Sequence, residues 1–273
     1  MNMLMPTINI KKIKISHEVP FCLLEKSRKF NDYDYCLPHL MDENEEYRNF
    51  FYKSKEMGRY IVMDNSLHEL GEAYNTKQLI YWINEIKPDE FIIPDVWENS
   101  KASIKNAEEW IRIKLPEEVL KVAVVQAKHI WEAKDCVQVY KNLGYQKIAF
   151  SYGAEYYHEL CPHSNKDLGK AIGRYIVVHK LYNSKVLTVL DRVHLLGTAS
   201  PIEFGMYKNI ECIESIDTSN PIMAAIEEMP YTKMGLHQKP LANMNKYQDI
   251  SIDFLNEDLV EYNIKMFKKI NEL

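Results

Sequence analysis

Short runs of apolar residues alternate along this chain with longer stretches in which apolar residues recur at helical spacing. The runs hold about five or six residues and are rich in β-branched side chains, so they predict buried strands. The longer stretches, of about 10–15 residues, predict helices that pack on the strands. The predicted strands are 9–16, 20–25, 59–64, 90–95, 121–126, 146–150, one strand within 186–196, and 213–217. The predicted helices are 44–57, 76–87, 100–114, 130–143, 167–183, a short one at 201–207, 220–228 and 256–273.

This alternation predicts parallel β-α-β units, because parallel neighbouring strands need a crossover connection between them. About seven or eight such units fit a (β/α)8 TIM barrel, an α/β fold, at this chain length. We expect one domain over residues 1–273, with strands at the N-terminal end and a closing C-terminal helix. An open doubly wound sheet is the alternative, although no Gly-x-Gly-x-x-Gly follows the first strands to indicate a dinucleotide site.

Composition and charge favour an ordinary globular protein, with 46% hydrophobic and 27% charged residues. No apolar run approaches the roughly 20 residues of a membrane span, and we expect neither membrane association nor a secretory signal. The five cysteines form no Cys-x-x-Cys pair, which favours reduced thiols, a cytoplasmic location and no metal site. The net charge of −5 disfavours unspecific coating of nucleic acid but leaves room for a local basic groove.

Polar residues stand where several predicted strands end. In a barrel these carboxyl ends converge on one mouth, where the active sites of TIM-barrel enzymes lie. A single aspartate at a strand end often only caps a helix, and a glutamine there can be a satisfied polar group on a core strand. Three acids and an amide in the same register favour a polar pocket instead. The residues at these ends are Asp64, Asp95, Gln126, Ser151, Tyr152, Gly153, Gly197 and Asp217.

Six short motifs follow one another in a fixed order between about residues 60 and 228. They are Asp-Asn-Ser-Leu-His-Glu-Leu-Gly from Asp64, Phe-Ile-Ile-Pro-Asp up to Asp95, Val-Val-Gln up to Gln126, Ser151-Tyr152-Gly153, His-Leu-Leu-Gly from His194 to Gly197, and Ser-Ile-Asp up to Asp217. In this order they resemble the tRNA-guanine transglycosylase superfamily, which is queuine tRNA-ribosyltransferase-like. The similarity is greatest to its short phage-type members, which insert 7-deazaguanines into DNA.

The resemblance implies a role for each matched residue. Asp217 stands where the family has its nucleophile, and Asp64 stands where it has its first catalytic aspartate, to which we assign the acid/base role. Asp95 and Gln126 stand where the family recognises the base, whose donors and acceptors a carboxylate and an amide can read. Residues 151–153 match the segment whose backbone contacts the base. His194 and Gly197 match a family strand end, although a histidine in an apolar strand is more often a satisfied core residue.

The sequence departs from the family pattern in three ways. The family's Asp-Ser-Gly-Gly-Phe-Gln is here Asp-Asn-Ser-Leu-His-Glu, which changes the surroundings of the base. The Cys/His zinc site after the nucleophile and the appended RNA-binding domain both have no counterpart. We therefore expect a barrel without the zinc-binding insertion, no metal and no cofactor, and DNA as the polymer in preference to tRNA.

Several further residues are candidates for nucleic-acid contacts. Trp97 directly follows the Asp95 strand and can stack on a base. Lysines that follow strand ends would lie on the same side of a barrel as the aspartates, although each is equally well explained as a solvated surface residue. They are Lys101, Lys105, Lys128, Lys233 and Lys239.

These observations predict a pentosyltransferase that replaces guanine in DNA by a 7-deazaguanine through a covalent aspartyl–glycosyl intermediate. The expected partners are DNA, with RNA as an alternative, and a free 7-deazaguanine base. The expected location is the cytoplasm, of the host cell if a phage encodes the protein. A hydrolase of nucleosides or other N-glycosides would use the same acids, and a non-catalytic nucleic-acid-binding barrel is a second rival. A homodimer is compatible with the sequence.

Overall fold

Eight short parallel strands form one sheet in the order β1-β8-β7-β6-β5-β4-β3-β2. The computed structural model describes residues 12–72, 74–198, 200–236, 239–241 and 243–273. The strands are β1 (Lys14–His17), β2 (Asp34–Cys36), β3 (Ile61–Met63), β4 (Glu90–Ile92), β5 (Leu120–Val125), β6 (Lys147–Phe150), β7 (Arg192–Leu195) and β8 (Ile213–Thr218). This order follows the chain around the sheet, and β1 pairs with β8, as a (β/α)8 barrel requires. The exception is that β1 and β2 are not paired as neighbouring strands.

The two end strands of this sheet are joined through the residues that precede β2. The backbone N–H of Asp32 donates to the carbonyl of Ile15 at 2.8 Å, and the N–H of Ile15 donates to the Asp32 carboxylate at 2.9 Å. Asn31 accepts from the N–H of His17 at 2.7 Å. Because these contacts bring β1 and β2 together, the sheet is a nearly closed barrel, which confirms the TIM-barrel prediction over the open sheet.

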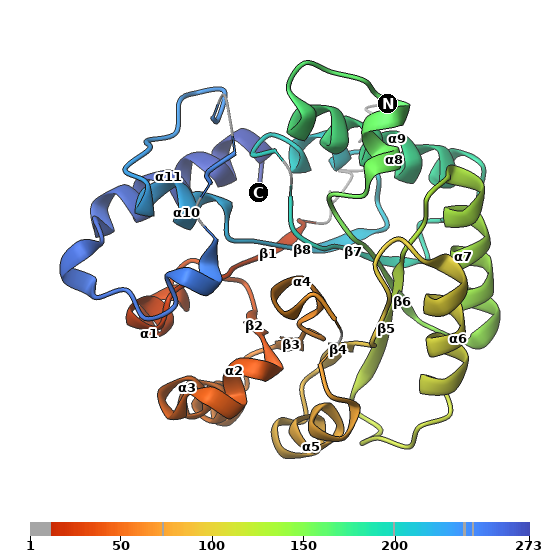
Figure 1. Cartoon of the computed structure of the whole chain (residues 1–273), viewed down its shortest axis with the longest axis horizontal. Helices are drawn as coiled ribbons and strands as arrows, with labels where there is room; N and C mark the ends of the chain where they lie inside the picture. Colours follow the sequence, from red (N-terminus) through yellow and green to blue (C-terminus); the bar gives the residue numbers. More distant parts are fainter. Residues whose placement is uncertain (1–11, 73, 199, 237–238, 242) are drawn as a thin grey trace, which may run out of the picture.

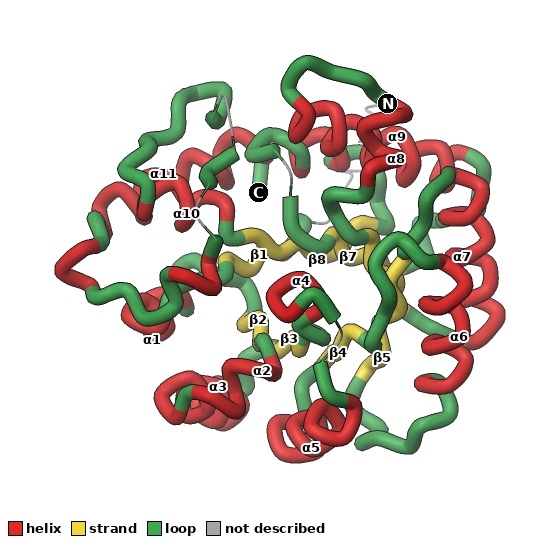
Figure 2. Tube along the Cα trace, viewed as in Figure 1, coloured by secondary structure: helices red, strands yellow, loops and turns green. Residues whose placement is uncertain are grey.

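Helices surround the strands, as Figures 1 and 2 show. The α-helices are α1 (Leu24–Ser27), α2 (Pro38–Glu43), α3 (Glu45–Glu56), α4 (Leu67–Leu70), α5 (Thr76–Ile86), α6 (Ser100–Trp110), α7 (Ile130–Leu143), α8 (Glu155–Leu160), α9 (Lys166–Asn183), α10 (Asn220–Ile226) and α11 (Glu257–Asn271). The 3₁₀ helices are η1 (Phe21–Leu23), η2 (Phe204–Tyr207), η3 (Met244–Lys246) and η4 (Ile252–Phe254). The predicted α-helices are confirmed apart from their ends, and the short helix predicted at 201–207 is the 3₁₀ helix η2.

The secondary-structure prediction fails in the N-terminal part of the chain, around the first two strands. Residues 20–25, predicted as a strand, form η1 and the start of α1, because a short apolar run cannot be assigned to strand or helix by its period alone. The strand that lies there, β2, has only three residues and was not predicted. The first predicted strand is confirmed for residues 14–16, while residues 9–11 lie outside the described part of the chain.

The interior of the barrel contains both apolar and polar side chains. A small apolar cluster of Ile92, Val122, Val124 and Ala149 lies apart from the main core, which fills the space between strands and helices. The other inward-facing positions described below carry charged and hydrogen-bonding side chains. Buried polar side chains therefore continue below the carboxyl-end mouth beside this apolar cluster.

Candidate active site

A cavity of about 400 Å³ opens at the carboxyl ends of the strands. Its walls come from the loops that follow the strands, from the short helix α4, and from residues 239–241 and 243–245, the last of which include the start of η3. Figure 2 draws α4 within the ring of helices, where it lies over the barrel mouth. A volume of roughly 300–1,000 Å³ is usual for small-molecule sites, so the cavity suits a ligand such as a nucleoside.

Most of the predicted site residues line this cavity. Gly153 is not among the lining residues, and a Cβ added to it would lie 3.5 Å from the ring of Trp97. His194 also is not among them, but it contacts the catalytic candidate Asp217 from below. The predicted residues that line the cavity are Asp64, Asp95, Trp97, Gln126, Ser151, Tyr152, Gly197, Asp217 and Lys239.

Four of the five predicted lysines lie away from the cavity wall. Lys101 and Lys105 are exposed on α6, and Lys105 is 3.9 Å from Glu109 one turn along that helix. Lys128 and Lys233 are exposed in loops. A role of these four in binding DNA stays a prediction, because a contact with a polymer would lie outside the cavity.

The Asp217 carboxylate is held by the strand next to it. Nε2 of His194 lies 2.9 Å from Oδ1 of Asp217, and the backbone N–H of Gly197 lies 3.3 Å from each carboxylate oxygen. The side chain retains some exposure toward the cavity. Asp217 is therefore fixed in orientation while a face of its carboxylate stays open to a ligand. Such a group can act as a nucleophile.

Asp95 is held by two amides. Nδ2 of Asn65 donates to Oδ1 and Nε2 of Gln126 donates to Oδ2, both at 2.6 Å. Gln126 in turn accepts from the backbone N–H of Glu98 at 3.1 Å. Burial raises the pKa of Asp95 to about 6, although the two amide donors favour its ionised form. The arrangement fixes an acceptor-rich edge at the cavity wall, as recognition of ligand N–H groups requires.

The buried carboxyl of Asp64 occupies another wall of the cavity. Burial raises its pKa to about 7, and the nearby negative charges of Asp217 and Asp95 add to the rise. The backbone N–H of Ser66 donates to it at 3.3 Å. A carboxyl with this pKa is present in both protonation states near neutral pH, which is the property of a general acid/base.

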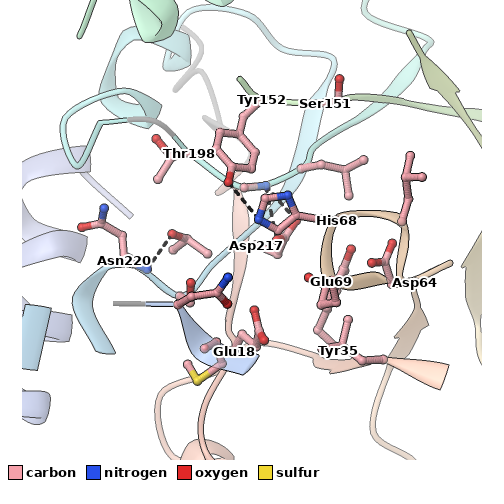
Figure 3. A pocket seen from close by; sticks show the side chains of 18 of the residues that line it. Glu18, Tyr35, Asp64, His68, Glu69, Ser151, Tyr152, Thr198, Asp217 and Asn220 are labelled. Atoms are coloured by element: carbon pink, nitrogen blue, oxygen red, sulfur yellow. Dashed lines mark hydrogen bonds between the residues drawn. The ribbon is translucent and has the colours of Figure 1, made fainter. Parts of the chain in front are cut away.

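Two acids in the cavity were missed by the sequence analysis. Figure 3 shows Glu18, from the loop after β1, and Glu69, from α4, around the same opening as Asp64 and Asp217. Burial and the neighbouring acids raise the pKa of Glu18 to about 8 and that of Glu69 to about 9. Glu18 directly follows β1, so the rule that selected acids at strand ends would have found it if the end of that strand had been predicted correctly. Glu69 lies in α4, away from any strand end, and that rule could not have found it.

The ring of Tyr152 forms a wall of the site through close packing on Gly197. A Cβ added at Gly197 would meet the Tyr152 ring at 2.6 Å, and Gly197 has a φ of +56°. The Tyr152 hydroxyl lies 3.1 Å from Nε2 of His68, and the Lys239 ammonium lies 4.7 Å from the centre of the ring. The ring thus links the strand-end glycine with two polar side chains at the rim.

Within the part of the chain that the structure describes, no group of three or more His, Cys, Asp or Glu side chains is arranged to hold a metal ion. None of the described helices combines the length and the apolar character that a membrane span needs.

Comparison with known proteins leaves the site geometry as the main guide to function. No protein-family model matches this chain. A search of curated proteins also gives no match.

Proposed function

We propose that this protein is a base-exchanging glycosyltransferase that replaces guanine in DNA by a 7-deazaguanine. The observation that carries the proposal is the pairing of two different carboxyl groups in one cavity. Asp217 is oriented by His194 and Gly197, while burial in the same cavity raises the pKa of Asp64 to about 7. Exchange without net hydrolysis needs a nucleophile and a separate proton carrier, and these two groups supply them.

In the proposed reaction a carboxylate oxygen of Asp217 attacks C1′ of the deoxyribose. The bond from C1′ to the base nitrogen breaks, and protonated Asp64 gives its proton to the departing guanine. The incoming base then occupies the same place, returns a proton to Asp64 and attacks C1′. This second attack breaks the ester bond and restores the Asp217 carboxylate. No water, oxidant or metal takes part in either step.

The held edge of Asp95 and Gln126 supports a guanine-like base as the ligand. The Asp95 carboxylate can accept from the ring N–H and the exocyclic amino group of such a base, and the Gln126 amide offers a donor and an acceptor. Trp97, which is partly exposed at the cavity, offers a surface for stacking. The resemblance of the strand-end motifs to the transglycosylases adds the 7-deazaguanine.

A base in duplex DNA must leave its stack to reach this cavity, at a cost of a few kcal/mol. Lys239 at the rim and the exposed Lys101, Lys105, Lys128 and Lys233 are the proposed contacts to the phosphates. Their positive charge would act locally, because the chain as a whole carries a net charge of −5.

The test is incubation of the protein with duplex DNA and labelled guanine or 7-deazaguanines, followed by digestion to nucleosides and mass spectrometry. Incorporation of the label without loss of DNA length supports the proposal. A folded Asp217→Asn protein should lose the activity, while Asp135→Asn, which changes an exposed acid on α7, should keep it.

The same experiment separates the proposal from its rivals. Release of guanine with abasic sites and no incorporation would identify a hydrolase, in which water takes the glycosyl group. Incorporation into RNA alone would move the substrate to RNA. Binding of DNA without either product would identify a non-catalytic barrel.

A further inference from the structure

A line of buried polar side chains runs from Asp217 down the inside of the barrel. Nδ1 of His194 lies 2.8 Å from Oγ of Ser215, and Nζ of Lys147 lies 2.9 Å from the same oxygen. Nζ of Lys147 is also 2.5 Å from a carboxylate oxygen of Glu90. All four of these side chains below Asp217 are at most 3% exposed. The proposed reaction assigns no role to Ser215, Lys147 or Glu90.

An irregularity between β7 and β8 brings these groups together. Val193 pairs with Ile213, but His194 pairs with Ser215, so Glu214 is an extra residue on β8. A bulge of this kind re-aims side chains and often lies next to an active site. Here Ser215 lies directly beside His194, and Glu214 also approaches Lys147, at 3.8 Å.

The ends of the line fix the direction of its hydrogen bonds. The Lys147 ammonium can only donate, so Oγ of Ser215 accepts from it. Oγ of Ser215 keeps one hydrogen to donate, and its remaining side-chain contact is with Nδ1 of His194, so this buried hydrogen has a partner when Nδ1 accepts it. The single hydrogen of the neutral imidazole therefore sits on Nε2, where it points at Oδ1 of Asp217.

The surroundings of Lys147 keep its charge in place. Burial lowers the pKa of this ammonium, but Glu90 and Glu214 act in the opposite direction. Arg192 contacts both glutamates at 2.6 Å, so that two cations face two anions at this level of the barrel. A buried charge is retained at tolerable cost only when it is paired in this way.

We propose that Ser215 and Lys147 are positioning residues that hold His194 in its neutral, Nε2-protonated tautomer. In this state the hydrogen bond from His194 orients the Asp217 carboxylate. A positively charged His194 would also orient the carboxylate, but its charge would make the carboxylate a weaker nucleophile. The tautomer is inferred from the pairing of the buried hydrogen-bond donors and acceptors, whereas its effect on the reaction rate rests on the proposed function.

Nitrogen NMR of the protein with ¹⁵N-labelled histidine tests the tautomer directly. The chain has nine histidines, and loss of one signal set in His194→Gln assigns the resonances. We expect Nδ1 of His194 to resonate as an unprotonated nitrogen and Nε2 as a protonated one at neutral pH. Protonated Nδ1 in the native protein, alone or together with Nε2, would overturn the proposal.

Two variants remove the proposed control. Ser215→Ala deletes the hydroxyl, and the double variant Lys147→Met/Glu90→Gln removes both charges so that neither is left buried and unpaired. Both should move the Nδ1 signal of His194 toward the protonated form, whereas Ser215→Thr, which keeps a hydroxyl, should leave it in place. An unchanged His194 signal in folded Ser215→Ala would overturn the proposal.

The kinetic arm uses the same variants. Loss of one hydrogen bond, about 0.5–1.5 kcal/mol, should lower kcat roughly twofold to tenfold in Ser215→Ala with little change in KM. Ser27→Ala, which removes another buried hydroxyl, in α1, controls for destabilisation and should keep kcat. Equal loss of kcat in both serine variants would remove the positioning role. If neither the native protein nor any variant exchanges bases, the proposed function fails. The NMR result still decides the tautomer of His194 in that case.

Discussion

Nε2 of Gln126 lies 2.6 Å from Oδ2 of Asp95, across the gap between the ends of two neighbouring strands. Asn65 holds the other oxygen of the same carboxylate at an equal distance. A buried acid with both oxygens bound by amides has a fixed orientation, and we propose that Asp95 recognises the base through hydrogen bonds.

Gln126→Glu should abolish this arrangement. It places a second carboxyl against Asp95 in a buried site, where one of the two must take up a proton and the edge offered to the base changes. A hydrogen bond to a charged group is worth about 1.5–3 kcal/mol, so affinity for the free base should fall roughly tenfold to a hundredfold. Calorimetric titration with the base measures this effect.

The matched control is Gln78→Glu. Gln78 donates to Asp42 at 2.9 Å in an exposed amide–carboxylate pair away from the cavity. The Gln78→Glu variant should bind the free base as tightly as the native protein does. Equal binding by the Gln126 variant would show that the Asp95 edge does not contact the base.

The positions of Asp64, Asp95, Gln126 and Asp217 could be predicted from the sequence, because each follows an apolar run and strand ends of a barrel meet. The same logic did not reach Glu69. It lies in a four-residue helix inside a loop, and its position depends on how that loop folds back over the mouth. The hydrogen-bond line from His194 to Lys147 was also unpredictable, since it depends on a one-residue bulge that shifts the register of β8.

The pH dependence of the first chemical step should report on Asp64. Its pKa is raised to about 7 by burial, so the protonated form that donates to the leaving base predominates below pH 7 and is lost above it. We expect kcat/KM for release of guanine to approach its maximum about one unit below pH 7 and to fall about tenfold per pH unit well above pH 7. Single-turnover measurements across this range provide the profile.

Asp64→Asn, which cannot donate this proton, should be slow at every pH and should lose the decline above pH 7. Asp135→Asn should reproduce the native profile. A native rate that increases through pH 7 would mean that Asp64 acts first as a base, contrary to the proposed order of steps.

Gly197→Ala should damage both the fold and the site. The residue has a left-handed φ of +56°, which costs a side chain roughly 1–2 kcal/mol, and the new methyl group would collide with the Tyr152 ring. Gly144→Ala has the same kind of backbone cost, at a φ of +94°, but nothing lies within 4 Å of the new methyl group. We expect a larger loss of unfolding free energy at Gly197, measured by denaturant titration.

The exchange assay should separate the two glycine variants further, since only Gly197 donates to Asp217 and packs on Tyr152. Gly144→Ala should keep native exchange wherever it is folded. Equal stability and equal exchange in both variants would contradict the packing described for Tyr152.

Reversal of charge at Lys128 and Lys233 should weaken DNA binding. Each phosphate contact contributes a slope of about −0.9 to the dependence of log affinity on log salt, so losing two contacts should make the slope shallower by about two. Binding to a duplex across a salt series measures it. The same reversal at Lys265 and Lys269, exposed on α11, should leave the slope unchanged. Equal slopes in both double variants would remove Lys128 and Lys233 from the DNA contacts.

The central claim is that the Asp217 carboxylate becomes covalently bonded to the sugar. The most direct measurement is peptide mass spectrometry after the protein has reacted with DNA in the absence of an incoming base and has been denatured. We predict a deoxyribosyl adduct on the peptide that contains Asp217, present in the Asp135→Asn control and absent from Asp217→Asn. An adduct on Asp64, Glu18 or Glu69, with Asp217 unmodified, would contradict the account.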